Sequence, residues 1–275
     1  MPAFGKRRAL GQHFLRDKSI ATLIAQTAVQ GAHERGSVAL LEIGPGKGAI
    51  TDLLLDELKA KSPHLPMLLS ERDRELAAQW RVRAHMEKDL EVAEGDFLEL
   101  PESTWLARTP LAVASNLPYS AGTAIVVRLA EHPDKITIMV LMFQAEVAQR
   151  LRAEPGTKSW GSLSIWIQNQ WEVRKLCAVP PGAFAPPPDV DSEVVVLTPR
   201  ANPYVAVGKG ERERKLWDSL LKTSFAHRRK MLRSSLPEPF RNALERSGLD
   251  GTKRAEALNW DEWSRFYQAL LSVTS

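Results

Sequence analysis

The chain has 275 residues, of which 44% are hydrophobic and 25% are charged, and its formal net charge is +4. These proportions are typical of a folded globular protein and exclude a mainly disordered chain, a collagen and a coiled coil. The longest apolar stretch, residues 136–143, is far shorter than the roughly 18 residues of a membrane span, so no membrane partner is expected. The basic start has no apolar segment typical of a signal peptide. The single cysteine, Cys177, excludes an intramolecular disulfide and favours a reducing cytoplasm.

The positive charge is concentrated at the two ends of the chain. Residues 201–275 contain 14 Lys and Arg against 9 Asp and Glu, a net of +5, whereas residues 1–200 contain 23 and 24, a net of −1. Residues 1–18 carry a local excess, with five basic residues and one acidic residue. Two basic ends that flank a neutral body indicate a polyanionic partner, although ordinary solvated surface charge explains the composition equally well.

Strands and helices are predicted to alternate through the first part of the chain. This alternation is typical of parallel βαβ units, with helices on both faces of the sheet. The predicted strands are residues 38–43, 67–70, 90–93, 111–115 and 136–142, and the helices are residues 19–30, 50–58, 74–85, 125–129 and 144–152.

The pattern changes after Gly161. A helix over residues 162–170 leads to two strands, 171–177 and 193–197, which a proline-rich loop joins without a helix, so an antiparallel pair at the sheet edge is expected. Only helical patterns follow, over residues 212–224, 227–235, 238–247 and 260–273. The sequence therefore predicts a Rossmann-like α/β domain over residues 1–200, with a basic amino-terminal segment over 1–18, and a small all-α domain over 201–275.

A glycine-rich turn follows the first of these strands. Gly44, Gly46 and Gly48 have the spacing G-x-G-x-G, whereas a dinucleotide fingerprint requires G-x-G-x-x-G. Glycines there let the backbone turn tightly and approach a ligand. The shorter spacing is more typical of S-adenosylmethionine sites, which have no pyrophosphate to hold, although a plain tight turn is the alternative.

Acidic residues follow the next two strands. Glu71 stands where a carboxylate accepts hydrogen bonds from both ribose hydroxyls of a nucleoside, and Asp96 can accept from the exocyclic amine of an adenine. Neighbouring Asp73 can equally cap the next helix. Ligands bind at the carboxyl ends of parallel strands, so these motifs together predict a nucleoside pocket.

The most specific motif, Asn116-Leu117-Pro118-Tyr119, ends the fourth strand. An aromatic amine is a poor nucleophile, so a site that methylates it must accept hydrogen bonds from its N–H groups and hold the nitrogen in line with the methyl group. The Asn116 side chain and the Leu117 carbonyl can accept, Pro118 stiffens the turn, and Tyr119 offers a face for stacking. The alternative is an Asn-Pro turn that caps a helix.

With these motifs the chain resembles the ribosomal RNA adenine N6-methyltransferase family, and within it the 16S rRNA adenine dimethyltransferases. The resemblance covers nearly the whole chain. It is carried by residues 8–15, by Glu42 to Gly48, by Asn116 to Tyr119, by residues 179–192, by residues 225–230 with Arg233, and by Arg254 to Glu256.

The resemblance implies a class I methyltransferase fold with S-adenosylmethionine as methyl donor and no metal. It implies cofactor contacts from His13, Leu15, Gly44, Gly46, Glu71, Asp96 and Asn116. It implies that a target adenine is flipped between Tyr119 and Phe184, although the sequence alone would place Phe184 in the core and His13 on the surface. It also implies RNA contacts from Arg228, Arg229, Lys230 and Arg233.

The expected substrate is the small ribosomal subunit precursor, with 16S rRNA dimethylated at N6 of two adjacent adenines in a 3'-terminal hairpin loop by a cytoplasmic monomer. The alternatives are a 23S rRNA methyltransferase of the macrolide-resistance type, a DNA adenine methyltransferase, a non-catalytic nucleic-acid-binding relative and a nicotinamide-dependent dehydrogenase. The chain departs from the family pattern at Trp160, Met231 and Ser234, which leaves the fine RNA contacts open.

Overall fold

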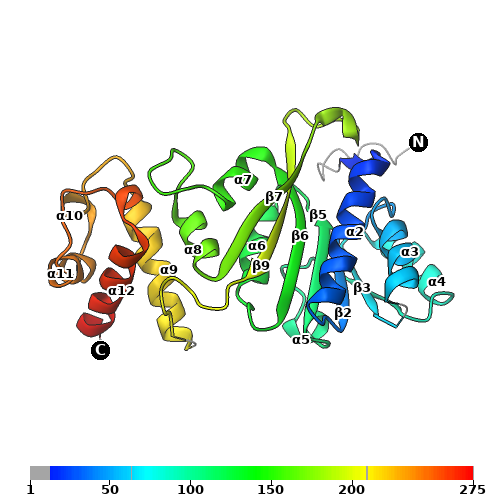
Figure 1. Ribbon diagram of the computed structural model, residues 1–275, viewed down its shortest axis with the longest axis horizontal. Coiled ribbons are helices and arrows are strands. Elements are labelled where there is room, and N and C mark those ends of the chain that lie inside the picture. Colours follow the sequence, from blue (N-terminus) through cyan, green and yellow to red (C-terminus); the bar gives the residue numbers. More distant parts are fainter. Residues whose placement is uncertain (1–12, 63, 209, 275) are drawn as a thin grey trace. The chain divides into compact units, whose positions relative to one another are not determined.

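The structure is a computed structural model that describes residues 13–62, 64–208 and 210–274. Contacts divide these residues into two units, which are described separately (Figure 1). The first unit contains the described residues up to Ala148 together with Glu172–Pro199, and the second contains Gln149–Trp171 together with the residues from Arg200 onward. One division falls between Pro199 and Arg200, one residue before the limit predicted from the sequence. Gln149–Trp171, however, groups with the second unit, so the first is not one continuous stretch.

A seven-stranded sheet in the order β4-β3-β2-β5-β6-β9-β7 organises the first unit. The pairs from β4 to β6 are parallel and β9 runs antiparallel to β6, which confirms the predicted mostly parallel sheet with an antiparallel edge. The strands are β2 (Ala39–Ile43), β3 (Met67–Glu71), β4 (Leu90–Glu94), β5 (Leu111–Asn116), β6 (Ile136–Gln144), β7 (Trp171–Val179) and β9 (Ser192–Pro199).

Helices cover both faces of this sheet, with α2 in front of it and α6 behind it in the view of Figure 1. Every residue of β2 is buried, and β6 is buried over most of its length. Such continuous apolar strands are expected where both faces of a parallel sheet are covered. The helices are α2 (Lys18–Glu34), α3 (Thr51–Lys61), α4 (Arg74–Ala84), α5 (Glu102–Trp105), α6 (Gly122–Ala130) and α7 (Ala145–Leu151), which crosses the boundary between the units.

The amino-terminal segment is attached to the proline-rich loop by a small second sheet. β1 (Phe14–Leu15) pairs antiparallel with β8 (Phe184–Ala185), and we call this pair the β1–β8 clip. Backbone N–H groups of Arg16 and Asp17 also donate to the Ala183 carbonyl, at 2.7 and 3.2 Å. Asp17 then caps α2 by accepting from two backbone N–H groups. The clip brings residue 13, which begins the described chain, to the edge of the sheet's ligand-binding end.

The second unit is helical. Its elements are α8 (Ser162–Gln170), α9 (Glu211–Phe225), α10 (Leu232–Ser235), α11 (Phe240–Arg246) and α12 (Trp260–Thr274). Its core is rich in aromatic side chains, with Trp160, Trp217, Trp263, Phe266 and Tyr267 all buried. No helix among the described residues is long and apolar enough to cross a membrane.

One predicted helix, over residues 227–235, is wrong for most of its length. Residues 226–229 form a turn in which Lys230 N–H donates to the His227 carbonyl at 2.8 Å, and only α10 is helical. Met231 interrupts the helix because its backbone is extended, with φ −65° and ψ 145°. Of residues 227–235, only Leu232 is buried in the core of this unit.

Candidate active site

The carboxyl ends of β2, β3 and β5 and the segment after β4 line one cavity of about 1000 Å³. Most of the residues predicted for the site meet there, which is the position expected for a ligand in a parallel sheet. The predicted residues that line it are His13, Leu15, Gly44, Gly46, Glu71, Asp96, Asn116, Leu117, Pro118 and Tyr119.

The glycine-rich turn after β2 forms one wall of the cavity. Gly46 and Gly48 have φ angles of +56° and +89°, in the region that favours glycine. A Cβ at Gly48 would lie 2.9 Å from the Trp80 ring, and the Trp80 indole N–H donates to the Gly46 carbonyl at 2.9 Å. Trp80 therefore fixes the turn. The sequence around Trp80 has no motif that indicates this role.

Glu71, the last residue of β3, connects this turn to its own loop. Its Oε2 accepts from the Gly46 N–H at 3.0 Å, and its Oε1 accepts from the Asp73 N–H at 2.9 Å. Burial raises the pKa of Glu71, and these hydrogen bonds oppose that shift. Each carboxylate oxygen has lone pairs beyond those used, so Glu71 can still accept from a ligand. Asp73 caps α4, which is the alternative weighed for it from the sequence.

Glu42, on β2, is a second buried carboxyl group beside the cavity. Burial is the main cause that raises its pKa to about 8; the carboxylates of Asp52 and Glu71 add to the shift, and the Thr51 side chain opposes it. Its Oε2 has no hydrogen-bond partner among the described residues. Glu42 is therefore mostly protonated at neutral pH. In the sequence, Glu42 is notable only as the first residue of the glycine motif.

Asp96 follows β4 and is only partly buried. Its Oδ1 accepts from the Leu98 N–H at 3.0 Å, and its Oδ2 lies 3.1 Å from Nη1 of the exposed Arg72. The carboxylate is thus held at the cavity wall by its own loop. Because β3 and β2 lie between β4 and β5 in the sheet, Asp96 lines a different part of the cavity wall from Asn116.

Asn116 ends β5, and its side-chain amide has a defined orientation. Its Nδ2 donates to the backbone carbonyl of His13 at 3.4 Å, so the amide oxygen is the atom that can accept from a substrate amine. The imidazole of His13 is itself held by Pro186, whose carbonyl lies 2.9 Å from Nδ1. The β1–β8 clip therefore orients Asn116, a long-range contact that no local sequence pattern indicated.

Tyr119 is half-buried at the mouth of the cavity. Its hydroxyl group lies 2.5 Å from Oγ of the buried Ser192, and the ring of His13 stacks on it with centroids 5.5 Å apart. Burial raises the pKa of Tyr119, so it remains a neutral phenol. The ring is consequently fixed at its hydroxyl end, a function of Ser192 that the sequence did not reveal.

Phe184 lies elsewhere. It is 4% exposed and packs in the hydrophobic core of the first unit, while its neighbour Ala185 lines the cavity. This is the core position that the residue type alone indicated, and the stacking role that the family resemblance implies for Phe184 stays a prediction.

The four predicted RNA-contacting residues lie in the second unit, and all are exposed. They differ in what they bind. The Arg228 guanidinium donates to the carbonyls of Trp160 and Lys158, at 2.7 and 3.0 Å, and lies 3.4 Å from Glu256. Arg228 therefore connects loops of its own unit, whereas Arg229, Lys230 and Arg233 project from the turn and from α10. Residues 1–12, which carry most of the basic amino-terminal segment, lie outside the described residues.

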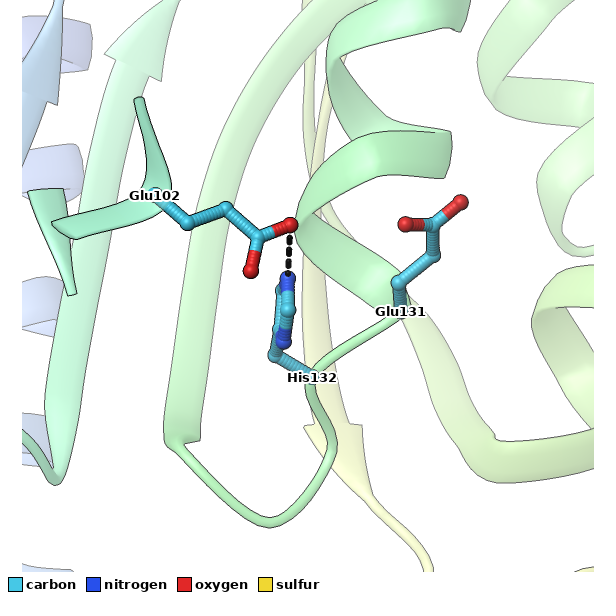
Figure 2. A group of neighbouring side chains, drawn as sticks. All are labelled: Glu102, Glu131 and His132. Carbon is cyan, nitrogen blue, oxygen red and sulfur yellow. Dashed lines mark ion pairs between the residues drawn. The ribbon is translucent and has the colours of Figure 1, made fainter. Parts of the chain in front are cut away.

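A cluster of titratable side chains outside the cavity consists of Glu102, Glu131 and His132 (Figure 2). Their possible ligand atoms lie within 4.8 Å of one another, and both glutamates are exposed. Figure 2 shows that His132 faces Glu102, with Nε2 and Oε1 3.3 Å apart, while the Glu131 carboxylate lies to one side and no ion pair is marked for it. The imidazole also packs edge-on against Trp105. We interpret the cluster as a structural histidine–carboxylate contact beside the buried Trp105.

The sheet order, the glycine turn and the acidic residues that follow β3 and β4 define a Rossmann-like fold of the class I methyltransferase type. The sequence profile of the family described as ribosomal RNA adenine dimethylase matches residues 3–271. The chain belongs to this family.

Individual relatives agree with this assignment. Ribosomal RNA small subunit methyltransferase A of Geobacter sulfurreducens is 37% identical over 97% of this chain and 96% of its own length. The protein of the same name from Magnetococcus marinus is 40% identical over 94% and 89%. Among solved structures, a dimethyladenosine transferase from Plasmodium falciparum has a TM-score of 0.71 at 24% identity, over 92% of this chain and 96% of its own. The structure of the 23S rRNA methyltransferase ErmE has a TM-score of 0.61 at 25% identity, and the match covers 94% of this chain and 99% of that one.

Proposed function

We propose that the protein transfers methyl groups from S-adenosylmethionine to N6 of two adjacent adenines in a 3'-terminal hairpin loop of 16S rRNA, in a precursor of the small ribosomal subunit. The observation that carries the proposal is that Asn116 to Tyr119 line the same cavity as Glu71 and the glycine turn. A methyl-acceptor motif and a nucleoside-binding wall therefore share one space.

The cavity residues fit the cofactor. Gly44, Gly46 and Gly48 line the cavity without side chains, Glu71 is a buried acceptor for ribose hydroxyls, and Asp96 is an acceptor for the adenine amine. His13, Leu15, Gly44 and Gly46 complete the proposed cofactor contacts. When bound, S-adenosylmethionine would supply a sulfonium methyl group whose carbon a nitrogen lone pair can attack, with S-adenosylhomocysteine as the leaving group.

The chain's own residues position the acceptor. The amide oxygen of Asn116 and the carbonyl of Leu117 accept hydrogen bonds from the two N–H groups of the adenine amine. These hydrogen bonds direct the nitrogen lone pair and stabilise the positive charge that develops on the nitrogen. Pro118 stiffens this turn, and Tyr119 stacks on the flipped base. Tyr119 and Asn116 contribute by position and electrostatics, so no strong general base is required. The absence of a metal requirement and the monomeric state stay predictions.

RNA binding is assigned to the basic second unit, with Arg229, Lys230 and Arg233 contacting phosphates. An rRNA substrate supports a cytoplasmic location. The nearest alternative is 23S rRNA, which the similarity to ErmE favours. The small-subunit name of relatives at 37% and 40% identity supports 16S rRNA instead. The methyl-acceptor motif argues against a non-catalytic relative.

The test is labelled methyl transfer to unmethylated small subunits, large subunits and duplex DNA in parallel. We expect transfer to small subunits alone, and loss of kcat by at least a hundredfold in Asn116→Ala with RNA affinity largely retained, because Asn116 acts on the reacting amine. Transfer to large subunits would establish the 23S alternative. Near-normal turnover of Asn116→Ala would remove Asn116 from the chemistry.

A further inference from the structure

Arg128, on α6, makes contacts that the proposed reaction has not used. Its guanidinium donates through Nη1 to the carbonyl of Phe97 and through Nη2 to the carbonyl of Leu100. The guanidinium also lies over two buried rings, 5.2 Å from the centroid of Phe97 and 5.5 Å from that of Trp105. A planar fork of donors between two aromatic faces is an arrangement that arginine makes and lysine does not.

The segment that Arg128 holds is the short loop after β4. The loop starts at Gly95, whose N–H donates to the Glu71 carbonyl at 2.9 Å, and then turns at Asp96, whose carbonyl accepts from the N–H of Leu100 at 3.1 Å. Arg128 thus binds the residue that follows Asp96 and the residue that closes the turn. Asp96 and Phe97 both line the cavity.

The helix that carries Arg128 also contacts the cavity. α6 begins three residues after Tyr119, and Ile125, about one turn before Arg128, lines the cavity. Arg128 therefore joins the loop at the adenine end to the helix that follows the methyl-acceptor motif. The other cation near Asp96, Arg72, has a side chain that is 67% exposed, so solvent screens it and it cannot fix the loop in the same way.

We propose that Arg128 is a positioning residue that holds the Asp96 loop and thereby determines how strongly the site distinguishes adenine from a purine without the exocyclic amine. The inference rests on the proposed function, because it takes Asp96 as the acceptor for that amine. Arg128 does not touch the cofactor in this account. It acts through Phe97 and Leu100 on the position of the Asp96 carboxylate.

The experiment measures by calorimetry the affinity of the full chain for S-adenosylhomocysteine and S-inosylhomocysteine, which has an oxygen in place of the exocyclic amine. We expect the wild type to prefer the adenine compound by roughly tenfold or more, the value of one well-placed hydrogen bond to a charged acceptor. Arg128→Met should lower this preference to near unity. Arg108→Met is the matched control, because Arg108 is exposed and, among the interactions described for it, pairs only with Glu91. The preference of this variant for the adenine compound should equal that of the wild type.

A double-mutant comparison separates positioning from general destabilisation. Asp96→Ala should remove the preference by itself, and Arg128→Met added to it should lower affinity for the adenine compound no further. Should Arg128→Met fail to fold, Arg128→Lys gives the same readout, with an intermediate preference expected because lysine lacks the fork.

The outcomes are distinguishable. An unchanged preference in the Arg128 variants, or equal weakening of both ligands, overturns the inference. A wild type that binds neither ligand overturns the proposed function instead. A wild type that binds both equally removes the adenine contact of Asp96 and this inference with it, while leaving methyl transfer intact.

Discussion

At the scale of single residues, Glu71 serves two purposes. Its carboxylate holds the glycine turn through Gly46 and is also the proposed ribose acceptor. Glu71→Ala removes both, so we expect affinity for S-adenosylhomocysteine to fall by about 1–3 kcal/mol, or roughly 5- to 160-fold. Glu71→Gln is the control, because its amide keeps one acceptor oxygen and should lose less. Calorimetry gives both values, and unchanged affinity in Glu71→Ala would remove Glu71 from the cofactor site.

Glu42 makes stability depend on pH in an unusual direction for a carboxyl group. Its pKa is raised from 4.5 to about 8 in the folded state, so between these values the folded protein holds a proton that the unfolded chain has lost. The stability from this group is complete below about pH 4.5 and is lost as the pH rises through about 8, by at most about 1.4 kcal/mol per pH unit.

Glu42→Gln removes that titration. As the pH rises from 6 to 9, we expect the free energy of unfolding of the variant to increase relative to that of the wild type. Denaturant unfolding at several pH values measures it. Glu57→Gln is the comparison, because the pKa of this partly exposed carboxyl is lowered by Gln26 and Lys61, so its titration lies below this window. A difference between Glu42→Gln and wild type that is constant over this range would show that Glu42 is ionised throughout.

At the scale of elements, the β1–β8 clip is expected to be stabilised chiefly by Leu15, which is 4% exposed in the core of the first unit. Leu15→Ala should lower the free energy of unfolding by about 2–5 kcal/mol. It should also speed amide exchange at Arg16 and Asp17, whose N–H groups donate to Ala183. Leu98→Ala makes the same chemical change at an exposed position and should have little effect. Exchange rates that do not change at Arg16 and Asp17 would show that the clip is held by its backbone bonds.

The elements that could be predicted from the sequence are those with strong local patterns. The buried strands and α8 follow from apolar runs and helical spacing, and the site residues after β2, β3 and β5 follow from topology, because parallel strands end at the same edge of a sheet. The β1–β8 clip could not be predicted, since it joins residues about 170 positions apart through only two residue pairs. No local pattern encodes such a contact.

Other features that the sequence does not predict also depend on contacts between residues far apart in the chain. The family resemblance implies an RNA contact from Arg228, and the structure adds that its guanidinium donates to backbone carbonyls that lie about 70 residues earlier in the chain. Arg128 had no motif around it, and its importance depends on two carbonyls and two rings that only the fold brings together. Residue type predicts the core position of Phe184, whereas the family resemblance implies a role in stacking.

The second unit provides a prediction about RNA affinity. Reversing the charges of Arg229 and Lys230 should weaken RNA binding and reduce its salt dependence, with the slope of log affinity against log salt falling by roughly 0.7–0.9 for each phosphate that the variant no longer binds. Arg228 is left unchanged because its hydrogen bonds support the unit itself. Reversal of Lys59 and Lys61 on α3 changes the net charge equally in the first unit and should leave the slope near that of the wild type. Identical slopes in the two double variants would mean that residues 229 and 230 are ordinary surface charges.

For the whole molecule, the distribution of charge predicts the form of the substrate. Residues 201–275 carry a net charge of +5 and residues 1–18 carry an excess of +4, whereas the cavity is built by the first unit, which as a whole carries 19 Lys and Arg against 23 Asp and Glu, a net of −4. A large folded RNA can contact both basic stretches while one loop enters the cavity. A short hairpin can contact only part of this charge, so it loses much of the affinity that comes from counterion release.

We therefore expect a partly assembled small subunit to be a better substrate than free RNA. Methylation of unmethylated small subunits, protein-free 16S rRNA and the isolated target hairpin is compared at equal concentration and near-physiological salt. The particle should be modified fastest and the hairpin slowest, with the gap narrowing at low salt, where fewer phosphate contacts suffice. Dimethylation of two adjacent adenines strengthens this expectation, because a substrate anchored at several points needs only small shifts between transfers. A hairpin methylated as efficiently as the particle would show that recognition is confined to the loop, with the basic stretches playing no part in substrate choice.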